Sequence, residues 1–155
     1  MRILMTADAV GGVWTYSVAL IRALPDHEFV LATLGPRPTG AQRAAVGELS
    51  NVTLAESDWK LEWMEGGHGD IVGSGNWLLQ LEAEWRPDVV HLNGFAHGAL
   101  PFAAPVLVVA HSCVCSWWRA VKQAEAPGEW NPYRQAVARG LNGAAMVVAL
   151  SLIHI

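Results

Sequence analysis

Residues 2–24, RILMTADAVGGVWTYSVALIRAL, decide the fold of this chain. The apolar run from Arg2 to Thr6 predicts a strand, Asp8 to Gly12 predicts a turn, and Val13 to Leu24 predicts a helix that is apolar on nearly all sides. A helix with so little polar surface is expected to be buried. We therefore expect this strand, loop and helix to lie at the centre of the domain.

The loop of this unit contains the paired glycines Gly11 and Gly12. Because glycine has no Cβ atom, it can adopt positive φ values and lets a ligand approach the backbone closely. The helix that follows directs its free N–H groups and the positive end of its dipole to the same place, which favours a phosphate or another anion. The alternative is that the two glycines only close a tight turn.

The composition indicates one domain with a large buried core. The chain has 155 residues, of which 52% are hydrophobic and 15% are charged, whereas about 25% charged residues is usual. The length suits one domain of ordinary size. The net charge is −4 and no Lys/Arg cluster occurs, which argues against a nucleic-acid surface and leaves small molecules as the expected partners.

Several features indicate where the chain resides. The stretch 89–118 contains no Asp, Glu, Lys or Arg, but its prolines, histidines and Asn93 favour two buried strands over a transmembrane segment. No signal peptide is recognisable at the N-terminus. Cys113 and Cys115 are the only cysteines, and such a closely spaced pair cannot staple a fold. We expect reduced thiols and a cytoplasmic location.

Strand and helix patterns alternate along the rest of the chain. Further strands are expected at Glu28–Leu34, Asn51–Leu54, Asp88–Leu92, Val106–Ala110 and Ala145–Leu150. Helices are expected from a Thr39 cap to Glu48, over Val72–Trp85 and Trp117–Lys122, and from an Asn131 cap, with Pro132 first, to Asn142-Gly143. This alternation predicts an α/β fold with a Rossmann-like parallel sheet of about six strands and helices on both faces.

A long irregular stretch, Glu56 to Asp70, interrupts this alternation. It carries Trp59, Trp63 and the sequence GGHG at 66–69. Connections of this length in compact domains are often lids or binding loops. The alternative is a disordered surface loop.

Three distant segments are predicted to meet at one cleft. In parallel α/β sheets, ligands bind outside the carboxyl ends of the strands, where the strand order reverses. The strand ends there deliver Gly11 and Gly12, Asn93, and His111. A nicotinamide-dependent oxidoreductase is disfavoured, because the chain lacks both the G-x-G-x-x-G fingerprint and an acidic residue after the second strand.

The motifs at these strand ends resemble those of a known family. MRIL at 1–4 with Gly11-Gly12-Val13, PDVVHLN at 87–93 and VVAHS at 108–112 together resemble the N-terminal domain of family-4 retaining glycosyltransferases of the GT-B architecture. The resemblance covers residues 1–150 and implies the N-terminal half of a GT-B fold, in which this domain holds the acceptor and a second domain holds most of the donor.

The resemblance also implies an activity and a set of site residues. The activity is that of a hexosyltransferase-type glycosyltransferase, which moves a sugar from a nucleoside diphosphate sugar to a hydroxyl of a sugar or glycan acceptor with retention. The donor is a substrate, so no cofactor or metal is implied. His111 corresponds to a catalytic-site histidine beside the transferred sugar; the alternative is a hydrogen-bonded structural histidine. Expected substrate-binding residues are Gly11, Gly12, Val13, Trp14, Asn93, Ser112 and Trp117.

Some of these residues have alternative roles. Asn93 replaces a second histidine of many relatives, and it can bind a hydroxyl but cannot exchange a proton at neutral pH. Trp14 and Trp117 can stack on sugar rings, or they can fill the core or cover a docking surface. Asp8 can contact the acceptor, or it can bond nearby backbone N–H groups.

The remaining histidines are expected to have no catalytic role. His91 is interpreted as a core histidine, and His68 and His97 as solvated loop residues. His111, Cys113 and Cys115 alternate like metal ligands, but a zinc site needs a fourth ligand. We therefore expect no metal site.

The chain ends with SLIHI at 151–155, where relatives continue into a second domain. We expect residues 151–155 to be a non-native tail, the C-terminal donor-binding domain to be absent, and this chain to be inactive alone. The alternative function is a non-catalytic module that binds a nucleotide or sugar phosphate through the glycine loop.

Overall fold

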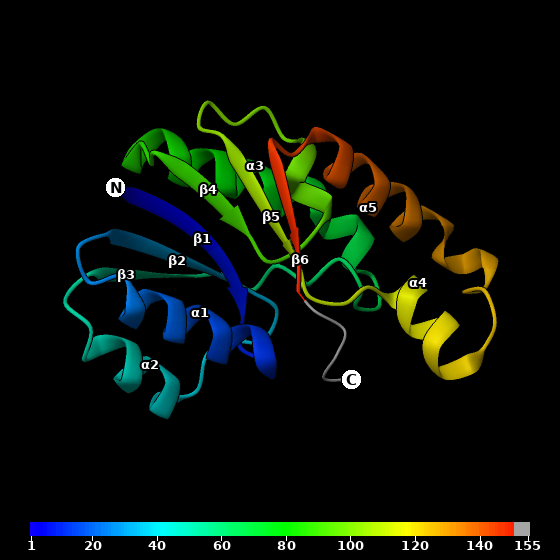
Figure 1. Cartoon of the computed structure of the whole chain (residues 1–155), viewed down its shortest axis with the longest axis horizontal. Coiled ribbons are helices and arrows are strands. Elements are labelled where there is room, and N and C mark those ends of the chain that lie inside the picture. The colour runs from blue at the N-terminus through cyan, green and yellow to red at the C-terminus, as the bar shows by residue number, and fades with distance from the viewer. Residues whose placement is uncertain (151–155) are drawn as a thin grey trace.

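The computed structural model describes residues 1–150, which form a parallel sheet between two layers of helices (Figure 1). The strands are β1 (Arg2–Asp8), β2 (Glu28–Leu34), β3 (Val52–Glu56), β4 (Val89–Leu92), β5 (Val106–Ala110) and β6 (Met146–Ala149). The α-helices are α1 (Gly12–Ala23), α2 (Gly40–Gly47), α3 (Gly67–Trp85), α4 (Val114–Trp117) and α5 (Asn131–Gly143). Shorter helical turns are η1 (Ala96–Ala99), the π-helical η2 (Trp118–Lys122) and η3 (Gly128–Trp130).

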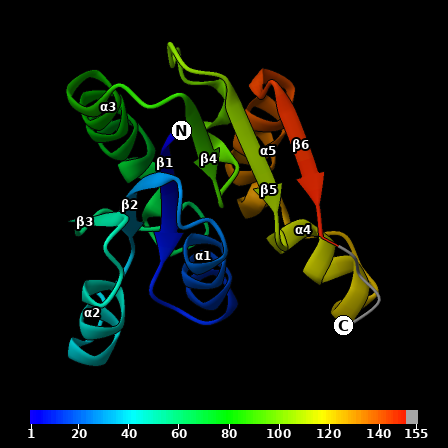
Figure 2. The same ribbon diagram turned by 60° about the vertical axis from the view of Figure 1, so that its left-hand side comes forward.

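The six strands run parallel in the order β3-β2-β1-β4-β5-β6 (Figure 2). This confirms the predicted α/β fold and its Rossmann-like sheet. The chain builds outward from β1 to β3 and then returns to place β4 on the other side of β1. The strand order therefore reverses between β1 and β4, where open α/β sheets bind ligands.

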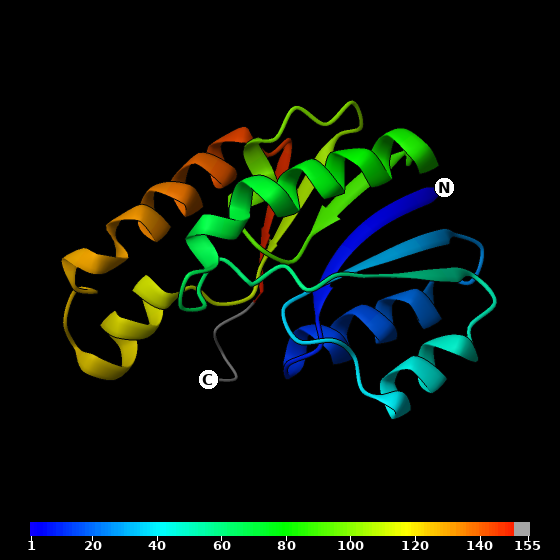
Figure 3. The same cartoon turned by 180° about the vertical axis from the view of Figure 1, so that it is seen from behind.

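Each face of the sheet has its own hydrophobic core. Successive side chains of a strand point to opposite faces, so Met5 of β1 packs in the layer of α1 and α2, and Leu4 packs in the layer of α3 and α5. Both side chains are fully buried. The two helical layers are visible on opposite faces of the sheet in Figures 1 and 3.

The expectation that α1 is buried on nearly all sides is wrong. Its face at Trp14, Val18 and Ile21 packs on the sheet, but Thr15 and Arg22 on its other side are exposed. The helix lies in an outer layer of the described part of the chain (Figure 1). Of the predicted strand, loop and helix, the strand β1 does lie near the middle of the sheet.

Several element boundaries differ from the predicted ones, and α3 differs most, since it begins at Gly67 instead of Val72. A Cβ atom on Gly67 would lie 2.0 Å from the carbonyl oxygen of Leu61. The first turn of α3 thus packs directly on the backbone of the preceding loop. This tertiary contact has no signature in the local hydrophobic pattern.

The uncharged stretch 89–118 folds as β4, η1, β5, α4 and the first residue of η2, so it contains the two expected strands. Within residues 1–150, no helix has both the length and the apolar character needed to cross a bilayer. The edge strand β6 pairs with β5 and has exposed side chains throughout, including Met146 at 61%.

Helical turn η1 packs backbone to backbone on α5 through glycines. A Cβ atom on Gly140 would lie 1.7 Å from the carbonyl oxygen of Phe95, and one on Gly98 would lie 2.3 Å from the carbonyl oxygen of Gly140. Both positions therefore require glycine. This contact fixes the segment that follows β4 against α5.

Candidate functional site

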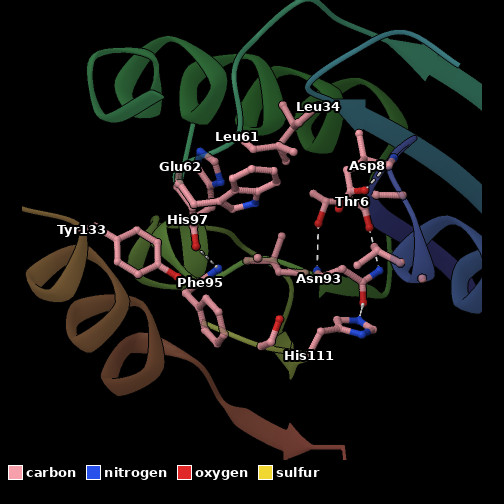
Figure 4. Close-up of a pocket in the computed structure, with 18 residues that line it drawn as sticks. Thr6, Asp8, Leu34, Leu61, Glu62, Asn93, Phe95, His97, His111 and Tyr133 are labelled. Carbon is pink, nitrogen blue, oxygen red and sulfur yellow. Dashed lines mark hydrogen bonds between the residues drawn. The ribbon is translucent and has the colours of Figure 1, made fainter. Parts of the chain in front are cut away.

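A cavity of about 310 Å³ lies at the carboxyl ends of β1, β4 and β5, where the strand order reverses (Figure 4). Its volume is at the lower end of the range for small-molecule sites, about 300–1,000 Å³. The cavity lining includes the following residues of the candidate site: Asp8, Gly12, Val13, Glu62, Asn93, His97, His111, Ser112 and Tyr133.

The glycine loop forms one wall of this cavity. Gly11 has φ of +80°, which a side chain would strain, whereas Gly12 begins α1 with no positive φ. A Cβ atom on either glycine would meet no atom within 4 Å. Turn closure therefore explains Gly11 but not Gly12, whose position is compatible with close approach of a ligand.

Asp8 shapes the same loop from the end of β1. Its Oδ1 accepts a hydrogen bond from the backbone N–H of Val10 at 2.8 Å, which is the backbone role considered as an alternative above. Burial raises the pKa of Asp8, and the hydrogen bond from Val10 partly offsets this effect. No side chain caps α1, so its first N–H groups have no side-chain acceptor.

Asn93 connects the ends of β1, β4 and β5 at the cavity. Its Nδ2 donates to the carbonyl oxygen of Thr6 at 2.7 Å and to Oγ of Ser17 at 3.3 Å. Its Oδ1 lies 2.9 Å from Nε2 of His111 and 3.3 Å from Nε2 of His91. A carboxamide has two donor hydrogens and two acceptor lone pairs, so these four contacts use the whole side chain.

Of the two histidines on Asn93, His91 is buried and His111 is half-buried. The ring of Tyr16 meets His111 edge-on at 4.9 Å between centroids, and His91 is tilted against it at 6.0 Å. Burial lowers the pKa of His111. Burial also lowers the pKa of His91, to about 4, although its bond to Asn93 opposes the shift. Both rings are therefore neutral at pH 7.

Glu62 reaches the cavity from the loop between β3 and α3 and was not predicted as a site residue. Its Oε1 and Oε2 accept the backbone N–H groups of Phe95 at 3.1 Å and Ala96 at 2.7 Å. Burial raises the pKa of Glu62, and these bonds partly offset it. Loop residues Leu61, Glu62 and Trp63 line the cavity, so the irregular stretch is a wall of the site. Its unusual length was the only sequence signal.

Tyr133 of α5 also lines the cavity, although it was not predicted as a site residue. Its hydroxyl accepts the N–H of Val114 at 3.3 Å. Burial raises the pKa of Tyr133, and the nearby Glu62 carboxylate adds to the rise. The phenol is therefore a neutral group at physiological pH.

The cavity brings together five of the predicted site residues: Gly12, Val13, Asn93, His111 and Ser112. Gly11 adjoins it in the loop. The expectation that Trp14 borders the cavity is corrected, because its side chain is 8% exposed and packs in the core beneath α1. Trp117 is 46% exposed on α4, packs edge-on against Trp118 and does not line the cavity.

The other histidines and the cysteines are also placed. His68 is exposed, as expected. The prediction that His97 is solvated is wrong, since it is 6% exposed and its Nε2 lies 2.9 Å from Oγ of Ser74 on α3. The thiol of Cys113 caps α4. Among residues 1–150, no three His, Cys, Asp or Glu side chains gather closely enough for a metal ion. Residues 151–155 lie outside the described part of the chain.

Comparisons with known proteins agree with this architecture. The sequence model of Glycosyltransferase Family 4 matches residues 10–152. Among solved structures, the fold is similar to that of TcCGT1 in complex with UDP, with a TM-score of 0.52 and 8% sequence identity. The match covers 97% of this chain and 44% of that one, so this chain spans less than half of that structure. No curated protein sequence matches the chain.

Proposed function

The chain belongs to Glycosyltransferase Family 4, and from this membership we propose that it is the acceptor-side domain of a retaining, hexosyltransferase-type enzyme. The donor is a nucleoside diphosphate sugar, the acceptor is a hydroxyl of a sugar or glycan, and most of the donor binds to a second domain that lies outside these residues. The cytoplasmic location expected from the two thiols belongs to the same proposal.

One observation carries this proposal: the cavity at the strand-order reversal is lined by both the glycine loop and His111. The N-terminus of α1 offers N–H groups and a positive dipole end to a diphosphate. The structurally similar TcCGT1 was solved with UDP, which supports a nucleoside diphosphate as the part of the donor that leaves when the sugar is transferred. The space at Gly12 permits the phosphates to approach the backbone.

The proposed reaction is a same-face substitution at the anomeric carbon. The acceptor oxygen forms a bond to that carbon while the bond to the diphosphate oxygen breaks. Its electron pair remains on the diphosphate, which also receives the proton of the acceptor hydroxyl. Since neutral His111 is a hydrogen-bonding group beside the sugar, catalysis relies on positioning and on stabilisation of the leaving diphosphate.

The test is to sequence the parent gene past codon 150 and to assay sugar transfer by the full-length protein. We expect a second α/β domain and a loss of activity of about 100-fold in His111→Ala. His68→Ala, at an exposed histidine, is the matched control and should retain activity. We expect residues 1–155 alone to show no turnover with any nucleotide sugar.

Other outcomes would favour the alternative. A genuine stop codon near residue 155, or a His111→Ala enzyme as active as its parent, would leave a module that binds a nucleotide or sugar phosphate at the glycine loop. Turnover by the 155-residue chain alone would show that a second domain is not required.

A further inference from the structure

We propose that Asn93 is a positioning residue that holds His111 as the Nε2–H imidazole and leaves its Nδ1 to accept a hydrogen bond from a ligand hydroxyl. The prediction above that Asn93 itself binds substrate is thereby replaced, because the four contacts already use its carboxamide. The identity of the ligand group rests on the proposed function, whereas the state of His111 does not.

The orientation of the Asn93 amide is fixed by Thr6. The carbonyl oxygen of Thr6 can only accept a hydrogen bond, so the amide atom 2.7 Å away must be the Nδ2 donor. The backbone N–H of Asn93 also donates to Oγ1 of Thr6 at 2.9 Å. Asn93 is thus bound to β1 through both its backbone and its side chain. The Oδ1 atom must face the two histidines.

This orientation determines which nitrogen of each ring carries the proton. Oδ1 is an acceptor, so Nε2 of His111 at 2.9 Å and Nε2 of His91 at 3.3 Å must both be donors. A neutral imidazole has one N–H and one lone pair. Burial keeps His111 in its neutral form by lowering its pKa. The lone pair of His111 is therefore on Nδ1.

The environment of Nδ1 favours a hydrogen-bond donor as its partner. Among residues 1–150, no hydrogen bond reaches this nitrogen, and it is not one of the buried polar atoms without a partner, so it is open to solvent. His111 lines the cavity, whose described lining has two carboxyl groups, Asp8 and Glu62, and neither Lys nor Arg. An anion without O–H groups would have nothing to donate to the lone pair of Nδ1, whereas a neutral hydroxyl can donate to it.

The state of His111 can be tested on the 155-residue chain labelled with ¹⁵N. Long-range ¹H–¹⁵N correlation near pH 7 should show a protonated Nε2 and an unprotonated Nδ1 for His111, assigned by the loss of these signals in His111→Gln. Exposed His68 is an internal control that should average between tautomers. Adding D-glucose should shift Nδ1 of His111, whereas adding sulfate, an anion that has no O–H group near pH 7, should not.

A substitution then tests whether Asn93 is responsible. Asn93→Leu should make His111 average between tautomers as His68 does. If that variant does not fold, Asn93→Asp keeps the acceptor oxygens and should retain the tautomer while raising the pKa of His111.

Each contrary result overturns a defined part of the proposal. A protonated Nδ1 in the wild-type chain, or averaging as in His68, would overturn it entirely. An unchanged tautomer in Asn93→Leu, or a lost tautomer in Asn93→Asp, would overturn the role of Asn93. A shift with sulfate, or none with glucose, would overturn the hydroxyl assignment. None of these readouts requires transfer activity, so failure of the proposed function would be recognised separately.

Discussion

Replacing Gly140 by alanine should destabilise the fold strongly, although alanine is the better helix former. The new Cβ atom would lie 1.7 Å from the carbonyl oxygen of Phe95, whereas ordinary contacts begin at 3.4 Å, so the two segments must separate by 1.7 Å. A gap of about 0.5–1 Å already forfeits a quarter to a half of a dispersion contact. Overpacking typically costs about 1–3 kcal/mol and occasionally more.

The net loss combines this cost with the helix preference of alanine, which is worth about 1 kcal/mol over glycine. Because the new Cβ atom would clash with backbone, we take the upper end of the overpacking range, about 3 kcal/mol. Subtracting the helix preference of about 1 kcal/mol gives an expected fall of about 2 kcal/mol in the free energy of unfolding. At about 2–4 °C per kcal/mol for a chain of this size, the midpoint of thermal unfolding should fall by about 4–8 °C.

Urea and thermal unfolding, followed by circular dichroism, would measure this loss. Gly47→Ala is the matched control, because Gly47 is also helical but a Cβ atom there meets nothing within 4 Å. The control should leave stability unchanged or raise it. If Gly140→Ala were as stable as its parent, η1 and α5 could separate without cost, and the backbone contact would not hold the segment after β4.

Three further predictions concern the site. The pKa of His91 is about 4 in the folded chain, whereas its ordinary value is 6.5, so the unfolded chain binds more protons between these two pH values. The free energy of unfolding should therefore fall by about 3 kcal/mol as the pH drops from 6.5 to 4. Urea titrations should show a smaller fall for His91→Leu. Burial raises the pKa of Glu62 in the folded chain, so the contribution of Glu62 to the free energy of unfolding should decline as the pH rises above 4.5 through that pKa. Glu62→Gln lacks this titration, and its stability relative to the wild type should increase from pH 4.5 to 8. A constant difference between the two proteins in urea unfolding would contradict the assignment. Gly11→Ala should lower the free energy of unfolding by about 1–2 kcal/mol, because φ of Gly11 is +80°. Gly12→Ala should stay within about 0.5 kcal/mol of the wild type. Equal losses of stability in the same urea assay would refute the distinction between the two glycines.

Most of the fold could be predicted because it follows from local patterns. Uninterrupted apolar runs such as VLVVA at 106–110 mark parallel strands that are covered on both faces, and β5 has these bounds. Thr39 was recognised as a cap and forms a capping box with Gln42. The early start of α3 was missed because the contact of Gly67 with Leu61 is set by tertiary packing.

The site could be predicted only where topology places residues at strand ends. Asn93 and His111 follow β4 and β5, and the parallel sheet brings them to one edge. Glu62 could not be identified in the same way, because it arrives on an irregular loop. Trp14 was misplaced because its position beside the glycine loop does not reveal which face of α1 turns toward the sheet.

The reversal of strand order between β1 and β4 has a consequence for protein engineering. The hollow at this edge is produced by the path of the main chain, as the two halves of the sheet send their helices in opposite directions. Exposed side chains such as Ser112 and Val10 line the hollow without creating it. A library that varies them can therefore search for new ligand preferences while the framework stays intact.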